Sequence, residues 1–140
     1  MKILLAVDGS AYTQKMLAYL TSHQEMLGTG HEYTIITVQP LLPPRARAAL
    51  GRDVVEQYYD EESAKILQPV LEFLKGRGVE AQSIAKVGPI ADTIIHAAQD
   101  GKFDLIAMGT HGHGALGRLV MGSVSSQVLA GCTIPVLLIR

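Results

Sequence analysis

The chain of 140 residues has a single cysteine, Cys132, so an intrachain disulfide is excluded. The net charge of −1 gives none of the electrostatic signature that nucleic-acid-binding domains carry. No apolar run reaches the roughly 20 residues that a membrane-spanning helix needs. Because 48% of the residues are hydrophobic and only 18% are charged, the composition also argues against disorder. We therefore expect one folded domain over residues 1–140, located in the cytoplasm, with no nucleic acid and no membrane as partner.

Strand-like and helix-like segments alternate along the chain. The first apolar run, residues 2–7, is short and ends at Asp8, which predicts a strand covered on both faces and not a signal peptide. Residues 39–52 contain three prolines and are expected to form a loop, and Asp53 is the expected cap of the helix that follows. Further strands are expected at 33–38, 81–87, 103–108 and 134–139, and helices at 13–27, 53–75, 89–99 and 123–131.

Strands separated by helices predict a parallel sheet with right-handed crossovers. The expected architecture is a three-layer α/β sandwich of Rossmann-like type, with strand order 3-2-1-4-5 and helices on both faces. In such a sheet the connections leave strands 1 and 4 in opposite directions, so a crevice opens at their carboxyl ends. Asp8 ends the first strand and Gly109 follows the fourth, so both are expected at this crevice.

A glycine-rich segment follows the fourth strand and leads into the last helix. Its pattern is glycine, two residues, glycine, nine residues, glycine and serine, and it is filled by Gly109, Gly112, Gly122 and Ser123. Glycine lets a ligand approach the main-chain N–H groups, and a helix N-terminus carries a partial positive charge, so the segment suits a phosphate chain. Ser123 or Ser125 is expected to cap the helix. The segment lacks the lysine of a P-loop and the downstream acidic residue of a dinucleotide fingerprint.

With this pattern the sequence resembles the universal stress protein family, in its ATP-binding branch. The resemblance covers nearly the whole chain and includes residues 3–10, Val87-Gly88 and residues 135–139. It implies ATP as the ligand, together with Mg²⁺, with Asp8 beside the nucleotide and Val38 near the adenine. We expect the main chain around Gly112, His113 and Ser123 to face the phosphates. The full set of expected nucleotide-binding residues is Asp8, Val38, Met108, Gly109, Gly112, His113, Gly122, Ser123, Val124 and Ser125.

Several of these residues have a purely structural alternative. Asp8 fits an N-cap of the first helix, Val38 a core position and Ser125 a helix start. A zinc site made by His111 and His113 is not expected, because zinc takes three or four protein ligands and no Cys/His cluster joins this pair. Two interpretations stay open for the arginines at 45, 47 and 52, a mobile lid over the phosphates or an ordinary solvated loop. Arg118, inside the glycine-rich segment, faces either the phosphates or a partner.

The function expected from this resemblance is that of an ATP-binding regulatory protein, not a dedicated enzyme. The alternatives are a nucleotide-free interaction module of the same family, and a slow ATPase or nucleotidyl-transfer enzyme. A homodimer is expected through the last strand, with Val136 and Ile139 among the contacts, because that strand lies at a sheet edge and the family often dimerises there. The sequence does not identify the protein partner.

Overall fold

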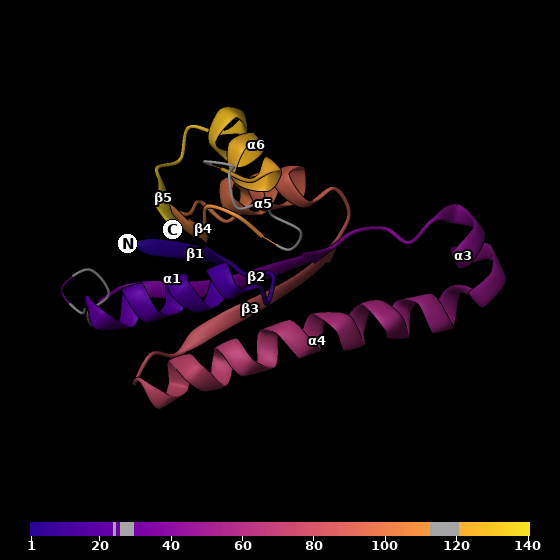
Figure 1. Ribbon diagram of the computed structural model, residues 1–140, viewed down its shortest axis with the longest axis horizontal. Coiled ribbons are helices and arrows are strands. Elements are labelled where there is room, and N and C mark those ends of the chain that lie inside the picture. Colours follow the sequence, from indigo (N-terminus) through magenta and orange to yellow (C-terminus); the bar gives the residue numbers. More distant parts are fainter. Residues whose placement is uncertain (24, 26–29, 113–120) are drawn as a thin grey trace.

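The computed structural model describes residues 1–23, 25, 30–112 and 121–140, which form a five-stranded sheet flanked by helices (Figure 1). All strand pairs are parallel and the order is β3-β2-β1-β4-β5, which confirms the expected topology. The strands are β1 (Lys2–Ala6), β2 (Glu32–Gln39), β3 (Ala81–Val87), β4 (Leu105–Gly109) and β5 (Val136–Ile139). The helices are α1 (Ala11–Ser22), α3 (Pro44–Leu50), α4 (Arg52–Gly76), α5 (Ile90–Asp100) and α6 (Ser123–Gly131).

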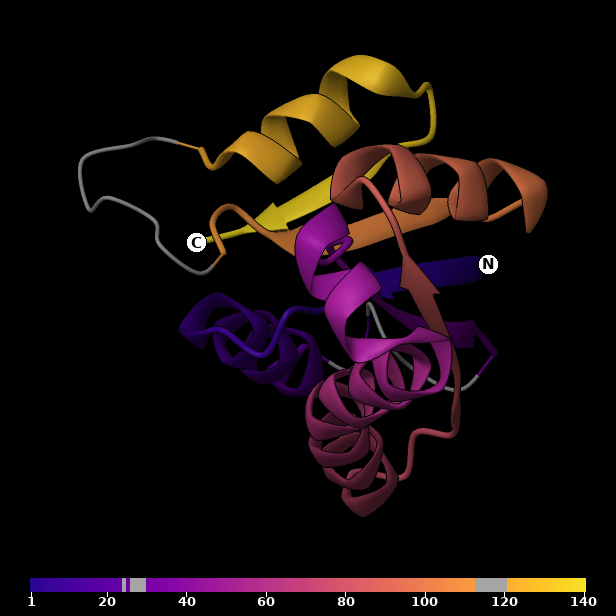
Figure 2. The same cartoon turned by 90° about the vertical axis from the view of Figure 1, so that its right-hand side faces the viewer.

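The sheet separates two hydrophobic cores, as the view from its end shows (Figure 2). Because side chains alternate along a strand, Ile3 and Leu5 of β1 enter the core beneath α1 and α4. Leu4 and Ala6 enter the core beneath α5 and α6. This two-sided burial explains why β1 is a continuous apolar run and why it lies at the centre of the sheet.

The expectation of a loop over residues 39–52 is wrong, because the structure forms α3 there. Pro44 opens this helix, where its fixed φ is favourable and its missing N–H is not needed. Gly51, with φ of 82°, separates α3 from α4. The predicted cap at Asp53 is also wrong, since Gly51 is the cap residue and Asp53 lies in the first turn of α4. There its negative charge stabilises the helix, because it lies near the positive end of the helix dipole.

The first helix also differs from its expected bounds. It begins at Ala11 and ends at Ser22, and the Ser10 side chain caps it by accepting a hydrogen bond from the Tyr12 N–H. The expected continuation to residue 27 falls on positions 24, 26 and 27, which lie outside the described residues.

Helix α4 is 25 residues long and reaches well beyond the sheet (Figure 1). Its amino-terminal half and α3 form a projection that we call the arm, residues 41–65. Within the arm, a hydrogen bond of 3.0 Å from the Leu42 N–H to the Tyr59 hydroxyl joins the segment before α3 to α4. Among the described helices, α4 included, none is long and apolar enough to cross a membrane.

Candidate functional site

A cleft of about 570 Å³ opens at the carboxyl ends of the central strands. It forms because β1 turns towards α1 on one face of the sheet, whereas β4 leads to α6 on the other face. The structure brings together at this cleft every predicted site residue that it describes. These are Asp8, Val38, Met108, Gly109, Gly112, Gly122, Ser123, Val124 and Ser125. The tenth, His113, lies outside the described residues.

Asp8 is held in position by the start of α1. Its Oδ1 accepts hydrogen bonds of 2.9 Å from the Ser10 N–H and from the Thr13 hydroxyl. The Asp8 N–H in turn donates to the Thr13 hydroxyl, and Thr13 is buried. The N-cap interpretation of Asp8 is wrong, because Ser10 fills that position. Asp8 instead stabilises the turn before the helix.

The other carboxylate oxygen of Asp8 is turned towards the glycine-rich segment. A Cβ added to Gly112 would overlap Asp8 Oδ2, so only glycine fits against this acid without a shift. The turn after Asp8 has a similar restriction, since Gly9 has φ of 77° and its added Cβ would lie 3.3 Å from Ile66 Cγ1. The acid and the glycine-rich segment therefore meet across the cleft, as their positions after β1 and β4 predict.

The start of α6 is joined to the end of β4 through one carbonyl group. Thr110 O accepts hydrogen bonds of 2.7 Å from the Gly122 N–H and from the Ser125 hydroxyl. Capping by Ser123 or Ser125 is therefore wrong. Gly122 is the cap residue and makes no side-chain cap bond, and the buried Ser125 hydroxyl binds carbonyl groups.

The amino end of α6 presents donors to the cleft. The intrahelical ladder begins at the Ser126 N–H, which donates to Gly122 O at 3.1 Å. The three preceding N–H groups, of Ser123, Val124 and Ser125, have no acceptor within the helix because of their position. All three residues line the cleft, so donors and the positive end of the helix dipole lie at its wall.

Two glycines of the motif have packing roles that the pattern alone does not reveal. A Cβ on Gly109 would lie 2.7 Å from Tyr12 Cβ, so this glycine lets α1 pack closely against β4. The Tyr12 ring also contacts the His111 ring, with the ring centroids 4.8 Å apart. A Cβ on Gly122 would lie 3.3 Å from both His111 Cα and Thr110 O, so this glycine lets the start of α6 lie close to the main chain that follows β4.

Val38 is buried and also contributes main-chain groups to the cleft. Carbonyls along β2 alternate between neighbours: Ile36 O accepts from the Val7 N–H, and Gln39 O accepts from the Gly88 N–H. Val38, two residues after Ile36, therefore directs its N–H and C=O towards the β1 side. The β1–β2 register ends at the Ala6–Ile36 pair, so this donor and acceptor face the cleft where β1 has ended.

The charges that line the cleft are acidic in the described part of the chain. Asp8 and Glu62 contribute carboxylates, and no described lining residue is a lysine or arginine. Glu62 Oε1 accepts a hydrogen bond of 2.9 Å from Lys65 Nζ, and this bond raises the pKa of Lys65. The described residues also contain no group of three or more His, Cys, Asp or Glu that could hold a metal ion.

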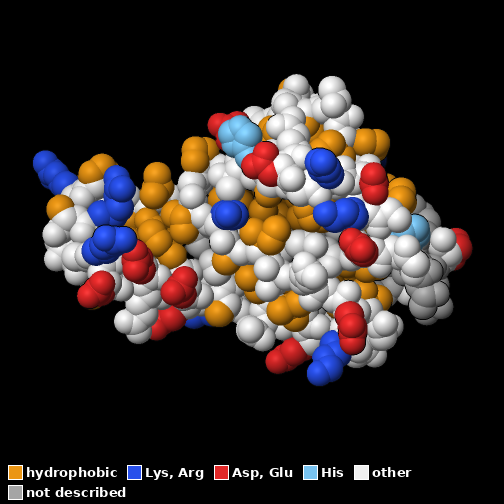
Figure 3. Space-filling model, turned by 180° about the vertical axis from the view of Figure 1, so that it is seen from behind, with side chains coloured by type: hydrophobic (Ala, Val, Ile, Leu, Met, Phe, Trp, Pro, Cys, Tyr) orange, Lys and Arg blue, Asp and Glu red, His pale blue; other side chains and the backbone are white. Residues whose placement is uncertain are grey.

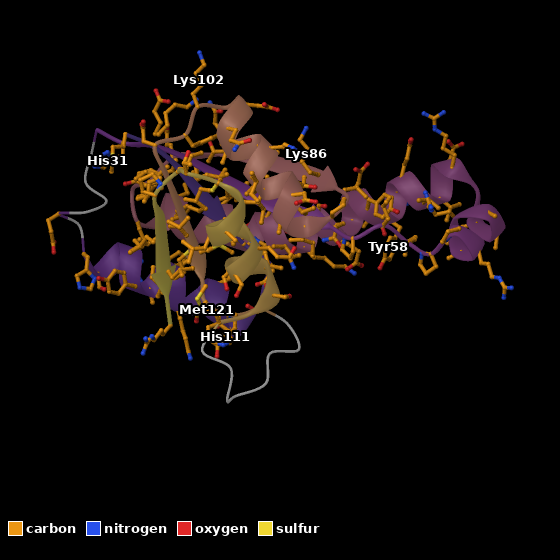
Figure 4. The ribbon with its side chains drawn as sticks, turned by 90° about the horizontal axis from the view of Figure 1, so that it is seen from above. His31, Tyr58, Lys86, Lys102, His111 and Met121 are labelled. Carbon is orange, nitrogen blue, oxygen red and sulfur yellow. The ribbon has the colours of Figure 1, made fainter. Side chains whose placement is uncertain are left out.

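The arginines at 45, 47 and 52 lie on the arm, and none of them lines the cleft. The structure thus gives no support to a lid made by these residues. Arg118, the other predicted cation, lies outside the described residues. In Figure 4 His111 and Met121, both within the glycine-rich segment, lie together, whereas Tyr58 lies away from them on the arm.

Sequence reasoning missed several lining residues. Glu62 and Ile66 lie one turn apart on α4 and reach the cleft from a helix that no motif marks. His111 lies inside the motif, but its spacing suggested only a metal pair. A second, wider depression of about 1120 Å³ lies at the amino ends of the strands, where none of the predicted residues is found.

Comparison with known proteins agrees with this architecture. The model of the Universal stress protein family matches residues 1–140, and the chain therefore belongs to that family. Universal stress protein YxiE of Bacillus subtilis is 30% identical, over 99% of this chain and 98% of its own length. Universal stress protein Slr1230 of a Synechocystis strain is 32% identical over 99% of this chain, and the match spans only 42% of that longer protein.

Solved structures share the fold at lower identity. Hypothetical protein MJ0577 of Methanocaldococcus jannaschii superposes with a TM-score of 0.83 at 23% identity, over 99% of this chain and 94% of that one. Two further structures hold nucleotides. A family member from Arabidopsis thaliana has AMP bound; its TM-score is 0.71 at 14% identity, over 99% of this chain and 90% of that one. A universal stress protein from Archaeoglobus fulgidus has dAMP bound; its TM-score is 0.67 at 20% identity, over 100% of this chain and 98% of that one.

Proposed function

We propose that this universal stress protein is a regulatory protein that binds ATP with Mg²⁺ in the cleft between β1 and β4. The observation that carries the proposal is the convergence of three features on one cleft: the α6 amino terminus, Asp8, and the Val38 main chain. Structural neighbours that hold AMP and dAMP support a nucleotide as the ligand class. The triphosphate and the metal go beyond those neighbours.

The Val38 main chain suits the base. A strand residue whose N–H and C=O face the same side offers one donor and one acceptor next to each other. The edge of adenine carries a matching pair, an amino group that donates and a ring nitrogen that accepts. The apolar side chains of Val38 and Met108, both buried, provide the flat surroundings that an aromatic base needs.

The α6 amino terminus suits the phosphates, and the cleft acids give the reason for the metal. Anions bind at helix N-termini because unpaired N–H groups and the dipole act together. The carboxylates of Asp8 and Glu62 repel a polyphosphate, and the described lining supplies no lysine or arginine to offset them. Mg²⁺ prefers oxygen ligands and is usually held by phosphates and a few carboxylates, which fits this donor set. We therefore expect ATP affinity to fall when EDTA removes Mg²⁺.

Binding without rapid turnover is part of the proposal. The described cleft residues do not include the lysine that phosphoryl-transfer sites use to hold the transferred group. The bound nucleotide instead stabilises the segment between β4 and α6, and a partner reads the resulting surface. We also propose a homodimer through β5, whose one neighbour in the described sheet is β4.

Isothermal titration calorimetry with ATP tests this function, in the presence of Mg²⁺ and again with EDTA. The proposal predicts one site per chain and tighter binding with Mg²⁺. AMP serves as the comparison, since it shares the base contacts but lacks the outer phosphates. Absence of binding for both nucleotides would instead favour the nucleotide-free interaction module.

A further inference from the structure

The arm exposes large apolar side chains that do not line the cleft. Leu50 at the end of α3 is 48% exposed, and Val54 and Tyr58, one turn apart on α4, are 50% and 41% exposed. Val54 and Tyr58 lie on the side of α4 opposite to its buried residues Val70 and Leu74, by the period of the helix. Within one chain these side chains are therefore only partly covered.

Apart from Lys65 at its end, the charges on the arm are sorted by sign along the chain. Its first half is basic and carries Arg45, Arg47 and Arg52. The next ten residues carry the acidic side chains Asp53, Glu56, Asp60, Glu61 and Glu62. Figure 3, seen from behind, shows basic side chains at the tip of the arm, acidic side chains below them and hydrophobic side chains beside both. The boundary between the two signs lies between residues 52 and 53.

We propose that the arm binds the arm of a second copy of this chain in an antiparallel arrangement. A two-fold axis near the sign boundary places the basic half of each arm against the acidic half of the other. Leu50 and Val54 lie on either side of that boundary, so the same symmetry brings apolar side chains together at the centre. Such an interface is self-complementary, as closed dimers require.

Competing arrangements are less favourable for the same reasons. A parallel pairing would place like charges against each other, which costs binding free energy. An anionic membrane would attract three arginines but repel the five carboxylates that follow them. Of the two ion pairs within the arm, the one at the sign boundary, Arg52 Nε to Glu56 Oε1 at 3.1 Å, joins side chains that are 88% and 60% exposed. Exposed pairs of this kind contribute little, so they do not prevent exchange for a partner across the interface.

Charge reversal tests the proposal in full-length protein carrying Val136→Lys, which removes pairing through β5 from the measurement. One variant reverses the charge of the basic tip (Arg45→Glu with Arg47→Glu), and a second reverses the charge of the acidic segment (Asp60→Arg with Glu61→Arg). Sedimentation velocity should show a dimer for the Val136→Lys parent and at least tenfold weaker association for each reversed variant alone. A 1:1 mixture should restore the dimer, because each reversed half then meets its opposite charge.

A matched control and a second variant complete the test. Glu72→Arg reverses an exposed charge on α4 outside the arm and should leave the dimer intact. Val54→Lys should weaken the arm dimer without changing the melting temperature of the monomer, because Val54 is half exposed in the monomer. The proposal is overturned if the parent is monomeric, if the mixture stays monomeric, or if the arm binds anionic vesicles while the protein remains monomeric. Failure of these outcomes leaves nucleotide binding at the cleft unaffected, so the two proposals are separable.

Discussion

Replacing Gly122 by valine probes the proposed phosphate site directly. Gly122 has φ of −77°, a conformation open to any residue, so the expected effect comes from space and not from backbone strain. The added Cβ would lie 3.3 Å from Thr110 O and from His111 Cα, tighter than an ordinary contact. Relief requires the start of α6 to shift by a few tenths of an ångström and weakens the 2.7 Å bond from the Gly122 N–H to Thr110 O.

The shift moves the first N–H groups of α6 away from the position proposed for the phosphates. A hydrogen bond to a charged group contributes about 1.5–3 kcal/mol, so losing one lowers affinity by roughly tenfold or more. Calorimetry with Mg·ATP measures the change, and thermal unfolding confirms that the variant is folded. Gly76→Val is the matched control, because a Cβ there meets nothing within 4 Å. Equal ATP affinity in wild type and a folded Gly122→Val would refute the proposed phosphate site.

Three further expectations concern turnover, assembly and stability. Single-turnover measurements with excess protein should show hydrolysis far below the typical enzyme range of roughly 1–10³ per second, and a rate within it that Asp8→Asn abolishes would favour an enzyme. In protein whose arm pairing is removed by Arg45→Glu with Arg47→Glu, adding Val136→Lys should convert the remaining β5 dimer to a monomer in light scattering, whereas a folded triple variant that stays dimeric would exclude that interface. Tyr33→Phe should keep or raise the melting temperature, because the Tyr33 hydroxyl is buried and has no hydrogen-bond partner among the described residues. Destabilisation by about 1 kcal/mol or more would show that the hydroxyl has a partner.

The sheet was predictable because each central strand carries its own signal. Residues 2–7 form a short apolar run before an acid, and this pattern specifies a buried parallel strand whichever helices surround it. Helix α3 was not predictable in the same way. Pro43 and Pro44 are typical of loops, yet Pro44 occupies the first turn of a helix, where proline is also favoured. The same residue type fits both outcomes, and the alanines that follow decide in favour of the helix.

The site residues that could be predicted are those that directly follow a strand, because the sheet topology then determines where they lie. Asp8 and Gly112 follow strands whose carboxyl ends meet, so topology alone brings them together. Glu62 reaches the cleft from the length and course of α4, which depend on packing across the whole sheet and leave no local pattern. The spacing of the glycine motif does not reveal that Gly109 also has a packing role. A larger residue at this position would overlap Tyr12, which packs against it. A glycine motif can therefore report packing as well as ligand approach.

Native mass spectrometry of gently purified protein tests the central claim most directly. The account predicts an adenine nucleotide at one per chain, either co-purified or acquired on addition of Mg·ATP, and its loss in Gly122→Val but not in Gly76→Val. A chain that keeps its bare mass with a large excess of Mg·ATP would contradict nucleotide binding at the cleft between β1 and β4.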